Sequence, residues 1–498
     1  MEVMEAMGFG AKWQQWIKWC IASPSLSVLV NGSPTKQFQM ERGLRQGDPL
    51  SPFLFNMVVQ VLSSMLDKAK WLGLIRGKGY GNDRVHITHL QFADDTVLFL
   101  EPKMEFLMNS RRILRCFELL SGLKINFHKS CLVRIGRNAS NEVHWAAAFR
   151  CVAALLPIFY LGLPLGGNSS REKFLEPIIK KVEQRLAPWK RAYISKGGRL
   201  VLIKAVLSSL PSYFMSVFSI PMGVAKKIEK IQRNFFWNDG VLNKKTHAVD
   251  WVTLCKNKHF GGLGIGRVKE KGVSMMVKWI WRFGREEDSL WRKFLCAKYK
   301  LDSNLIMWDV SEISNGSQFV KALSRFYDNN HRVSRFIKQG FQIVIGSGNR
   351  TRLWHDIRWD QVPLKVAFPR IFALASNKNG VILELGSWAA TMWNWDVKLR
   401  RSLFNWEIDQ WNGFKLVLEN IKLRNNIQDA LAWHFCPNGI FSVSSFRRCL
   451  EENGDHMDEF FPFIWKGICP PKIEVFTWQL LKGRLMVREV LRGLALME

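Results

Sequence analysis

The chain has 498 residues, of which 47% are hydrophobic and 12% aromatic, and its formal net charge is +30. This length exceeds one hydrophobic core, so about two to four domains are expected, and the apolar content excludes a disordered or fibrous chain. The excess of positive charge favours a polyanionic partner, with nucleic acid ahead of an anionic membrane surface.

The N-terminus does not have the pattern of a secretory signal, because Glu2 and Glu5 lie where such a signal would be basic. The longest uncharged stretch, residues 205–225, is interrupted by Pro211 and Pro221, which argues against a transmembrane helix. The nine cysteines are odd in number and include no CxxC pair. We therefore expect an intracellular protein with reduced thiols, neither secreted nor embedded in a membrane.

Residues 1–167 mix helix and strand patterns, with glycine-rich turns near 43–47, 77–82 and 162–167. This mixture predicts one α+β unit. Within it, a helix is expected that is capped by Asp48 or Ser51 and whose first residue is the following proline, Pro49 or Pro52. Its apolar face would consist of Phe53, Met57, Val61 and Met65. The turn Arg45-Gln46-Gly47 would lie at the helix entrance, where a glycine lets polar groups approach a ligand closely and Arg45 adds a phosphate-compatible charge. The alternative is a simple capped core helix.

A hairpin is predicted over residues 86–100, because two β-prone runs flank the adjacent carboxylates Asp94 and Asp95. Hard oxygen ligands concentrated at such a turn suit Mg²⁺. Taken alone, the pair is also compatible with an ordinary turn, since aspartate is a favoured turn residue.

Two amphipathic helices with basic outer faces are predicted between residues 172 and 237. The first has an apolar face of Phe174, Ile178, Val182 and Leu186, with Lys173, Lys180, Lys181 and Arg185 outside it. The second has Val224, Ile228, Ile231 and Phe235 on its apolar face, with Lys226, Lys227, Lys230 and Arg233 outside it. Each face alone could be ordinary solvated charge, but the same sign on both favours contact with a polyanion.

Beyond residue 238 the chain is rich in tryptophan. The glycine-rich segment 261–266 is interpreted as a turn and not as a dinucleotide loop, because Lys269 stands where a third glycine would be needed. The segment 278–283 contains Trp279, Trp281 and Phe283; it could stack nucleic-acid bases, but an aromatic helix in a core is the commoner arrangement.

Taken together, these segments resemble the reverse transcriptases of plant LINE-type (non-LTR) retrotransposons. Arg45-Gln46-Gly47-Asp48-Pro49-Leu50-Ser51-Pro52 is similar to the family's template-and-nucleotide motif, and Phe92-Ala93-Asp94-Asp95 to its catalytic motif, in the same order and spacing. Further segments resemble a palm motif (122–126 with Lys129-Ser130), the primer-grip region (160–166), the thumb of plant members (189–237) and a zinc-binding domain near the end (441–478).

The resemblance implies an RNA-directed DNA polymerase, a nucleotidyltransferase that acts on an RNA template, a DNA primer and dNTPs. Asp94 and Asp95 would be catalytic and would hold Mg²⁺, or Mn²⁺ in its place. Arg45, Gln46, Gly47 and Lys129 would contact nucleotide or template, and Leu161 and Gly162 would belong to the primer-grip region. Such a protein would work as a ribonucleoprotein in the nucleus or cytoplasm.

The implied domains are four. Residues 1–167 would be a partial palm, a small antiparallel sheet with helices, without fingers or the strand of the first catalytic aspartate. Residues 168–266 would be an α-helical thumb and connection, and residues 267–438 a mixed, mainly helical region without an assigned role. Residues 439–498 would be a truncated zinc-binding domain without its Cys and His ligands, so no zinc is expected.

The sequence departs from the family at one decisive point, because the family uses a third aspartate and no Asp precedes Asp48. We therefore expect an N- and C-terminally truncated reverse transcriptase that is inactive alone. Two alternatives are a non-catalytic basic protein that binds RNA or DNA, and a decayed retroelement reading frame.

Overall fold

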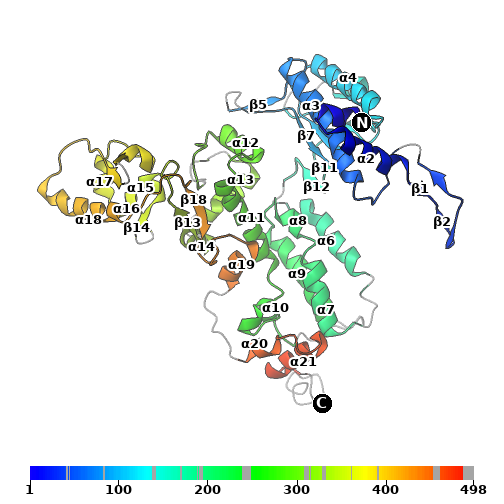
Figure 1. Cartoon of the computed structure of the whole chain (residues 1–498). Coiled ribbons are helices and arrows are strands. Elements are labelled where there is room, and N and C mark those ends of the chain that lie inside the picture. The colour runs from blue at the N-terminus through cyan, green and yellow to red at the C-terminus, as the bar shows by residue number, and fades with distance from the viewer. Residues whose placement is uncertain are drawn as a thin grey trace. The chain divides into compact units, whose positions relative to one another are not determined.

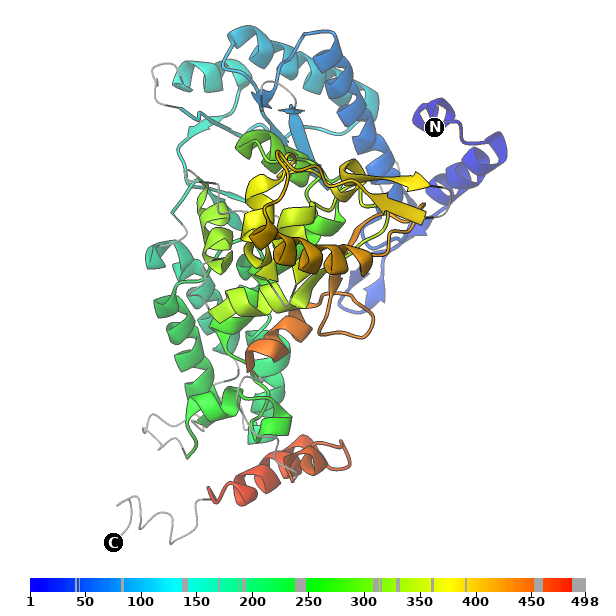
Figure 2. The same cartoon turned by 90° about the vertical axis from the view of Figure 1, so that its left-hand side faces the viewer.

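The computed structural model (Figures 1 and 2) describes residues 1–485 except 41–42, 44, 82–84, 137–141, 169–170, 188, 190–193, 238–247, 308–312, 314–315, 328–331, 360–361, 390–391 and 452–459. The chain divides into two compact units, Met1–Gly166 and Gly167–Glu498, called here the N-terminal and the C-terminal unit. Among the described residues, no helix is long and apolar enough to cross a lipid bilayer.

The N-terminal unit combines helices with very short strands. Its helices are α1 (Glu2–Ala6), α2 (Ala11–Ala22), α3 (Ser51–Trp71), α4 (Met104–Ser121) and α5 (Glu142–Phe149). Its strands are β1 (Ser25–Leu26), β2 (Leu29–Val30), β3 (Ser33–Pro34), β4 (Phe38–Gln39), β5 (Lys78–Tyr80), β6 (Val85–Ile87), β7 (His89–Phe92), β8 (Asp95–Leu98), β9 (Cys131–Val133), β10 (Val152–Ala154), β11 (Ile158–Tyr160) and β12 (Leu163–Leu165).

These strands pair in twos. Within the described residues of this unit, five ladders are antiparallel, and the sixth, β9 with β10, is parallel. The mixture of helices and small sheets agrees with the predicted α+β class. The structure differs from the expected small antiparallel sheet. Its strands are only two to four residues long, and among the described residues each strand pairs with one other strand, so no sheet of three strands forms.

The helices α3 and α4 provide the main core of the N-terminal unit. Leu62 and Leu66 of α3 pack with Leu114 and Phe117 of α4, and α4 ends at Gly122, whose φ of 71° lies in the left-handed region that favours glycine. The predicted apolar face of α3 is displaced by one residue: Leu54, Leu62, Leu66 and Ala69 are buried, whereas Phe53 is 66% exposed.

The C-terminal unit is mainly helical. Its first helices are α6 (Glu172–Leu186), α7 (Lys196–Leu202), the π-helical turn η2 (Ile203–Leu207), α8 (Ser212–Met215), α9 (Met222–Trp237), α10 (Trp251–Cys255), η3 (Lys258–Phe260), α11 (Val268–Arg285), α12 (Leu290–Tyr299), α13 (Gln318–Ser324), η4 (Arg325–Tyr327) and α14 (Arg332–Gly340). The later ones are α15 (Leu353–Asp356), α16 (Leu364–Ala367), α17 (Pro369–Leu374), η5 (Ile382–Leu385), η6 (Asn405–Glu407), α18 (Ile408–Glu419), α19 (Val443–Glu451), α20 (Phe461–Ile464) and α21 (Pro471–Leu481). Its strands form three antiparallel pairs: β13 (Phe341–Val344) with β18 (Ala430–Trp433), β14 (Arg358–Trp359) with β15 (Val362–Pro363), and β16 (Gly386–Ala389) with β17 (Met392–Trp395).

The hydrophobic cores in the described part of the C-terminal unit include the following three. The first is formed by α6, α7, α9 and α10 with α20 and α21; the second by α11 to α14 with β13, β18 and α19; and the third by residues 353–418. Figure 1 shows α21 beside α7, and Trp478 of α21 donates its indole N–H to the carbonyl oxygen of Gly261 (3.0 Å). Residues 439–485 therefore contribute to two of these cores.

The two predicted amphipathic helices are present as α6 and α9, which run alongside each other (Figure 1). Val182, Leu186, Val224, Ile228 and Phe235 are buried, and the lysines named for the outer faces are exposed. Lys227 of α9 forms an ion pair with Glu172 of α6 (2.6 Å). The predicted apolar faces are thus confirmed, and the predicted outer faces are confirmed except at Arg233, which is half-buried.

Two other predictions for this unit are confirmed. The segment 261–266 is an irregular turn between η3 and α11, and Gly261, Gly264 and Gly266 have positive φ. The aromatic segment 278–283 belongs to α11 and packs into the second core, where Trp281 stacks on Phe341 and Phe441.

Candidate active site

The strands β7 and β8 form the predicted hairpin. Phe92 pairs with Asp95, which leaves Ala93 and Asp94 as the two turn residues and makes Asp95 the first residue of β8. Ala93 has φ of 50°, a conformation that costs free energy for a residue with a Cβ atom. Asp94 and Asp95 are both exposed at this turn. Directly opposite residues share a face of the hairpin, so Asp95 lies on the face of Leu90 and Phe92 and away from that of His89.

The turn before α3 is fixed by hydrogen bonds. The amide of Asp48 donates to the carbonyl oxygen of Arg45 (3.3 Å), and Gly47 has φ of 91°, which explains the glycine there. Ser51 Oγ donates to the same carbonyl oxygen (2.8 Å), and Asp48 Oδ1 accepts from the amide of Leu50 (2.8 Å). The predicted cap by Asp48 or Ser51 is wrong: α3 follows Leu50 without a side-chain cap, because these two side chains brace the turn itself.

Two contacts show how the hairpin and α3 are oriented. Lys70 Nζ donates to the carbonyl oxygen of His86 (3.2 Å), and His89 Nε2 lies 2.8 Å from Ser63 Oγ. His86 thus lies near residue 70 of α3, and His89 lies near residue 63. The chain from 86 to 89 therefore runs toward the N-terminus of α3, and the hairpin turn that follows points toward the start of this helix. From Ser63 to Ser51 the helix rises about 18 Å. From His89 to Asp94 the strand covers about 17 Å. A strand that runs along α3 from Ser63 therefore brings the two aspartates to the end of α3 that carries the Arg45–Asp48 turn.

His89 was not singled out from the sequence, although it fastens the hairpin to α3. Its Nδ1 lies 3.0 Å from Thr88 Oγ1, and Thr88 is buried. Burial lowers the pKa of His89 and outweighs the nearby Asp67, which raises it. The imidazole therefore favours its neutral form. The signal available in the sequence was the alternation of β7, which puts His89 and Gln91 on the inner face.

The remaining predicted site residues lie on other elements of the same unit. Lys129 is exposed on the turn after α4, where its amide donates to Asn126 Oδ1 (3.1 Å). Leu161 and Gly162 are the two turn residues of the β11–β12 hairpin, with φ of 49° and 74°. Positive φ at both positions is the signature of a tight hairpin turn.

Asp94 and Asp95 suit a hard divalent cation as far as donor chemistry is concerned, because both are exposed carboxylates on adjacent residues. In the part of the chain that the structure describes, no group of three or more His, Cys, Asp or Glu side chains is placed to hold a metal ion. The pair thus offers part of a ligand set.

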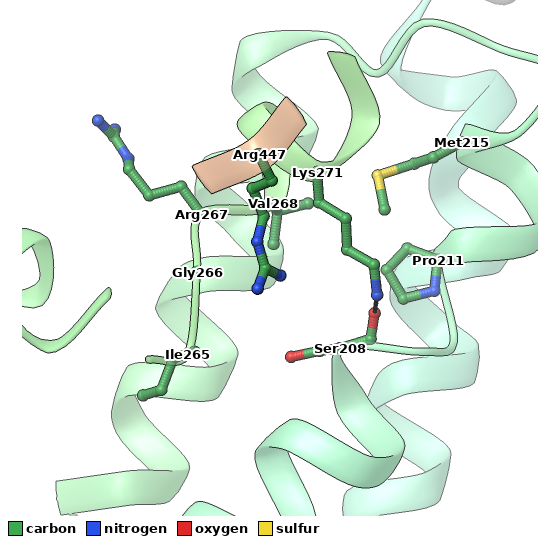
Figure 3. Close-up of a pocket in the computed structure, with 9 residues that line it drawn as sticks. All are labelled: Ser208, Pro211, Met215, Ile265, Gly266, Arg267, Val268, Lys271 and Arg447. Carbon is green, nitrogen blue, oxygen red and sulfur yellow. Dashed lines mark hydrogen bonds between the residues drawn. The ribbon is translucent and has the colours of Figure 1, made fainter. Parts of the chain in front are cut away.

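A small cavity in the C-terminal unit does not extend this site. It is lined by Ser208, Met215, Lys271 and Arg447, and Lys271 Nζ donates to the carbonyl oxygen of Ser208 (2.7 Å; Figure 3). Its volume of about 10 Å³ corresponds to about one water molecule. It is too small for a nucleotide.

The first comparison with known proteins concerns the N-terminal unit. The sequence matches the reverse transcriptase (RNA-dependent DNA polymerase) family over residues 1–165. It is 28% identical over 327 residues to an Arabidopsis thaliana protein named for ribonuclease H, covering 63% of this chain and 48% of the relative. It is 45% identical over 71 residues to an uncharacterized mitochondrial protein of the same plant, covering 14% of this chain and 58% of the relative.

A further relative is a retrovirus-related Pol polyprotein from a type-2 retrotransposable element of Drosophila melanogaster, 29% identical over 219 residues, with 42% of this chain and 20% of the relative covered. The chain spans less than two thirds of the length of each of these three relatives. The family match includes both the Asp94–Asp95 turn and the Arg45–Asp48 turn. Residues 1–165 therefore match a reverse transcriptase domain, and the similarity to retrotransposon Pol proteins is consistent with a reverse transcriptase of a non-LTR retrotransposon.

Proposed function

We propose that this chain is part of an RNA-directed DNA polymerase, in which Asp94 and Asp95 bind divalent cations beside the nucleotide. One observation carries the proposal: two adjacent exposed carboxylates lie on a strained turn of a hairpin that is fastened to α3 and directed toward the start of that helix. Reverse transcriptases generally use a divalent metal, Mg²⁺ above all, and act on an RNA template, a DNA primer and dNTPs.

In this proposal the residues have distinct tasks. Asp94 and Asp95 orient the cations, which when bound supply positive charge to the phosphate oxygens during attack by the primer 3′-OH. Gln46 and Gly47 present polar groups at the start of α3, and Arg45 and Lys129 add charge for phosphates. Leu161 and Gly162, on the β11–β12 turn, would support the primer.

The other domain assignments are proposals as well. Residues 1–167 would be palm, residues 168–266 thumb and connection, and residues 439–498 part of a zinc-binding domain, with the polymerase acting in a ribonucleoprotein in the nucleus or cytoplasm. Exposed lysines on α6 and α9 support a nucleic-acid contact by the thumb. They also favour the second candidate function, a non-catalytic RNA- or DNA-binding protein.

The cation-binding role is tested with Mn²⁺ and electron paramagnetic resonance, a readout that does not require activity. Asp94→Asn/Asp95→Asn should lose about one weakly bound Mn²⁺ per chain, because two carboxylates supply the ligands. The matched control is Asp396→Asn/Asp409→Asn, which neutralises two other exposed aspartates. Identical Mn²⁺ titrations for the wild type and the Asp94/Asp95 variant would remove the basis of the proposal.

Primer extension tests whether the site is complete. Among the residues that the structure describes, no third carboxylate joins Asp94 and Asp95 in a group that could hold a metal ion. We expect the purified chain, given an RNA template, an annealed DNA primer, dNTPs and Mg²⁺ or Mn²⁺, to extend the primer no better than Asp94→Asn/Asp95→Asn. Synthesis that depends on Asp94 and Asp95 would instead show a complete catalytic centre.

A further inference from the structure

The strand β13 has one unpaired edge in the C-terminal unit. In the described part of the chain β13 pairs with β18 alone, with Gln342 opposite Ala432 and Ile343 opposite Leu431. The amide of His434 donates to the carbonyl oxygen of Gly340 (2.8 Å). Hydrogen-bonded pairs alternate along an antiparallel ladder, so Gln342 and Val344 bond to β18 while the backbone of Ile343 faces away from it.

The N–H and C=O groups of Ile343 have no hydrogen-bond partner among the residues that the structure describes. Side chains on both faces of β13 border one cavity: Phe341 and Ile343 belong to one face, Gln342 to the other, and Ile345 follows the strand. A cavity that touches consecutive residues of a strand runs along its edge. The unpaired edge of β13 therefore lines this cavity.

The cavity is a groove of about 720 Å³. This volume lies within the range of roughly 300–1,000 Å³ that is typical of ligand sites. Its lining outside β13 includes the apolar residues Ile357, Val417 and Ile421 together with the polar Asn420. Apolar residues beside a strand edge suit a chain that can both bond to the edge and bury alternate side chains.

The groove is also positively charged. Lys338 and Lys422 line it, and Asp356 is the one carboxylate among the described lining residues. Asp356 is already engaged, because Arg352 donates to it from its amide (2.8 Å), its Nε (3.2 Å) and its Nη2 (3.0 Å). Unpaired strand edges are rarely left open in proteins because they template pairing with another chain.

We infer that this groove binds an extended peptide segment with acidic residues, which joins β13 as an additional strand. A single-stranded nucleic acid fits less well, because it stacks successive bases on several aromatic rings, and of the two phenylalanines that line the groove Phe435 is 40% exposed whereas Phe341 is only 1% exposed. The site lies outside the reverse transcriptase domain and does not depend on the polymerase assignment.

The test uses the full 498-residue chain and a fluorescein-labelled octapeptide of alternating Val and Glu, with binding measured by fluorescence anisotropy. Two further peptides are N-methylated at every Val or at every Glu. Because alternate amides of a strand face opposite edges, one methylated peptide should lose binding and the other should keep it. Equal binding by both would exclude strand pairing.

Ile343→Pro removes the N–H that faces the groove and leaves the bonds from Gln342 and Val344 to β18 in place. It should weaken peptide binding about five- to tenfold without a change in far-ultraviolet circular dichroism. Lys422→Glu, on an exposed residue of the groove, should also weaken binding, while Lys415→Glu, exposed on α18, should not.

Three results would overturn the inference. The first is an Ile343→Pro variant that binds the Val–Glu peptide as tightly as the wild type, and the second is equal affinity of the wild type for a Val–Lys peptide. The third is displacement of the Val–Glu peptide by an oligouridylate that itself binds the Lys422→Glu variant more weakly than the wild type. The last result would assign the groove to nucleic acid. If Ile343→Pro does not fold, Lys422→Glu and the methylated peptides decide.

Discussion

Lys204, on η2, is a half-buried cation near other cations. Burial lowers the pKa of its ammonium group from 10.5 to about 8, with further lowering by Lys258 and Arg447 and a small opposing effect of Glu474. The unfolded chain binds this proton more tightly than the folded protein does. Folding is therefore penalised below pH 8, and the penalty disappears as the pH rises from 8 to 10.5.

Lys204→Met should accordingly raise the free energy of unfolding by about 1–3 kcal/mol at pH 7, a range that allows for solvent screening at a half-buried site. The gain should fade as the pH rises from 8 toward 10.5, because the lysine of the folded protein is then neutral and carries no buried charge. Urea unfolding followed by tryptophan fluorescence at pH 7 and pH 10 measures the difference. Lys226→Met, at an exposed position of α9, is the control; an equal gain at both pH values would refute a charge effect.

Single residues of the candidate site were predictable to different degrees. Asp94, Asp95, Gln46 and Gly47 stand out because their neighbours form a hairpin and a glycine turn, which are local structures that a short segment specifies. His89 does not, since its contact with Ser63 joins residues 26 positions apart. The role of such a residue depends on contacts between distant segments, which the sequence pattern of a short segment does not specify.

At the level of elements, Asp429 holds the end of β13 to the start of β18. Its carboxylate is buried and accepts five hydrogen bonds: from the amides of Gly346, Gly348, Arg350 and Thr351 and from Thr351 Oγ1. These distances run from 2.7 to 3.0 Å. One side chain thus replaces the hydrogen bonds that the loop 346–351 would otherwise make with water.

Asp429→Ala should lower the free energy of unfolding of this region by about 3–5 kcal/mol, because several buried amides lose their acceptor. Hydrogen exchange should quicken most in residues 346–351 and at β18. Thr351→Val, which removes one of the five bonds, should cost only about 1 kcal/mol. A uniform loss of protection over the C-terminal unit would contradict a local clamp.

Helices were predicted best where hydrophobic residues recur at one constant helical spacing. The apolar faces of α6 and α9 were correct because polar residues bound them sharply, while α3 is apolar on several sides and its buried face was displaced by one position. The short ladders of the N-terminal unit were not predicted, since strands of two to four residues carry almost no periodic signal.

At the level of the whole molecule, the charge of +30 should make nucleic-acid binding strongly dependent on salt. Exposed Lys181, Lys226 and Lys230 of α6 and α9 are the proposed contacts. Replacing all three by Gln should reduce the slope of log affinity against log salt concentration by about two for single-stranded RNA. Filter binding over a salt series measures the slope.

The matched control replaces three exposed lysines elsewhere in the C-terminal unit, Lys321, Lys398 and Lys415, by Gln. The change in net charge is the same in both variants, so a purely global effect would reduce both slopes equally. A smaller slope for the α6 and α9 variant alone would locate the contact on those helices.

The pairing of α21 with α7 joins segments that are synthesised far apart in time. Lys196 Nζ donates to Gln479 Oε1 (3.3 Å) across 283 positions, and Trp478 is fully buried in the core that α7 and α9 also use. At about 5–20 residues per second, a ribosome needs roughly 15–55 s to travel from one segment to the other. During that interval α20 and α21 do not yet cover their side of the core that α6, α7, α9 and α10 form, so part of its apolar surface is exposed on the nascent chain.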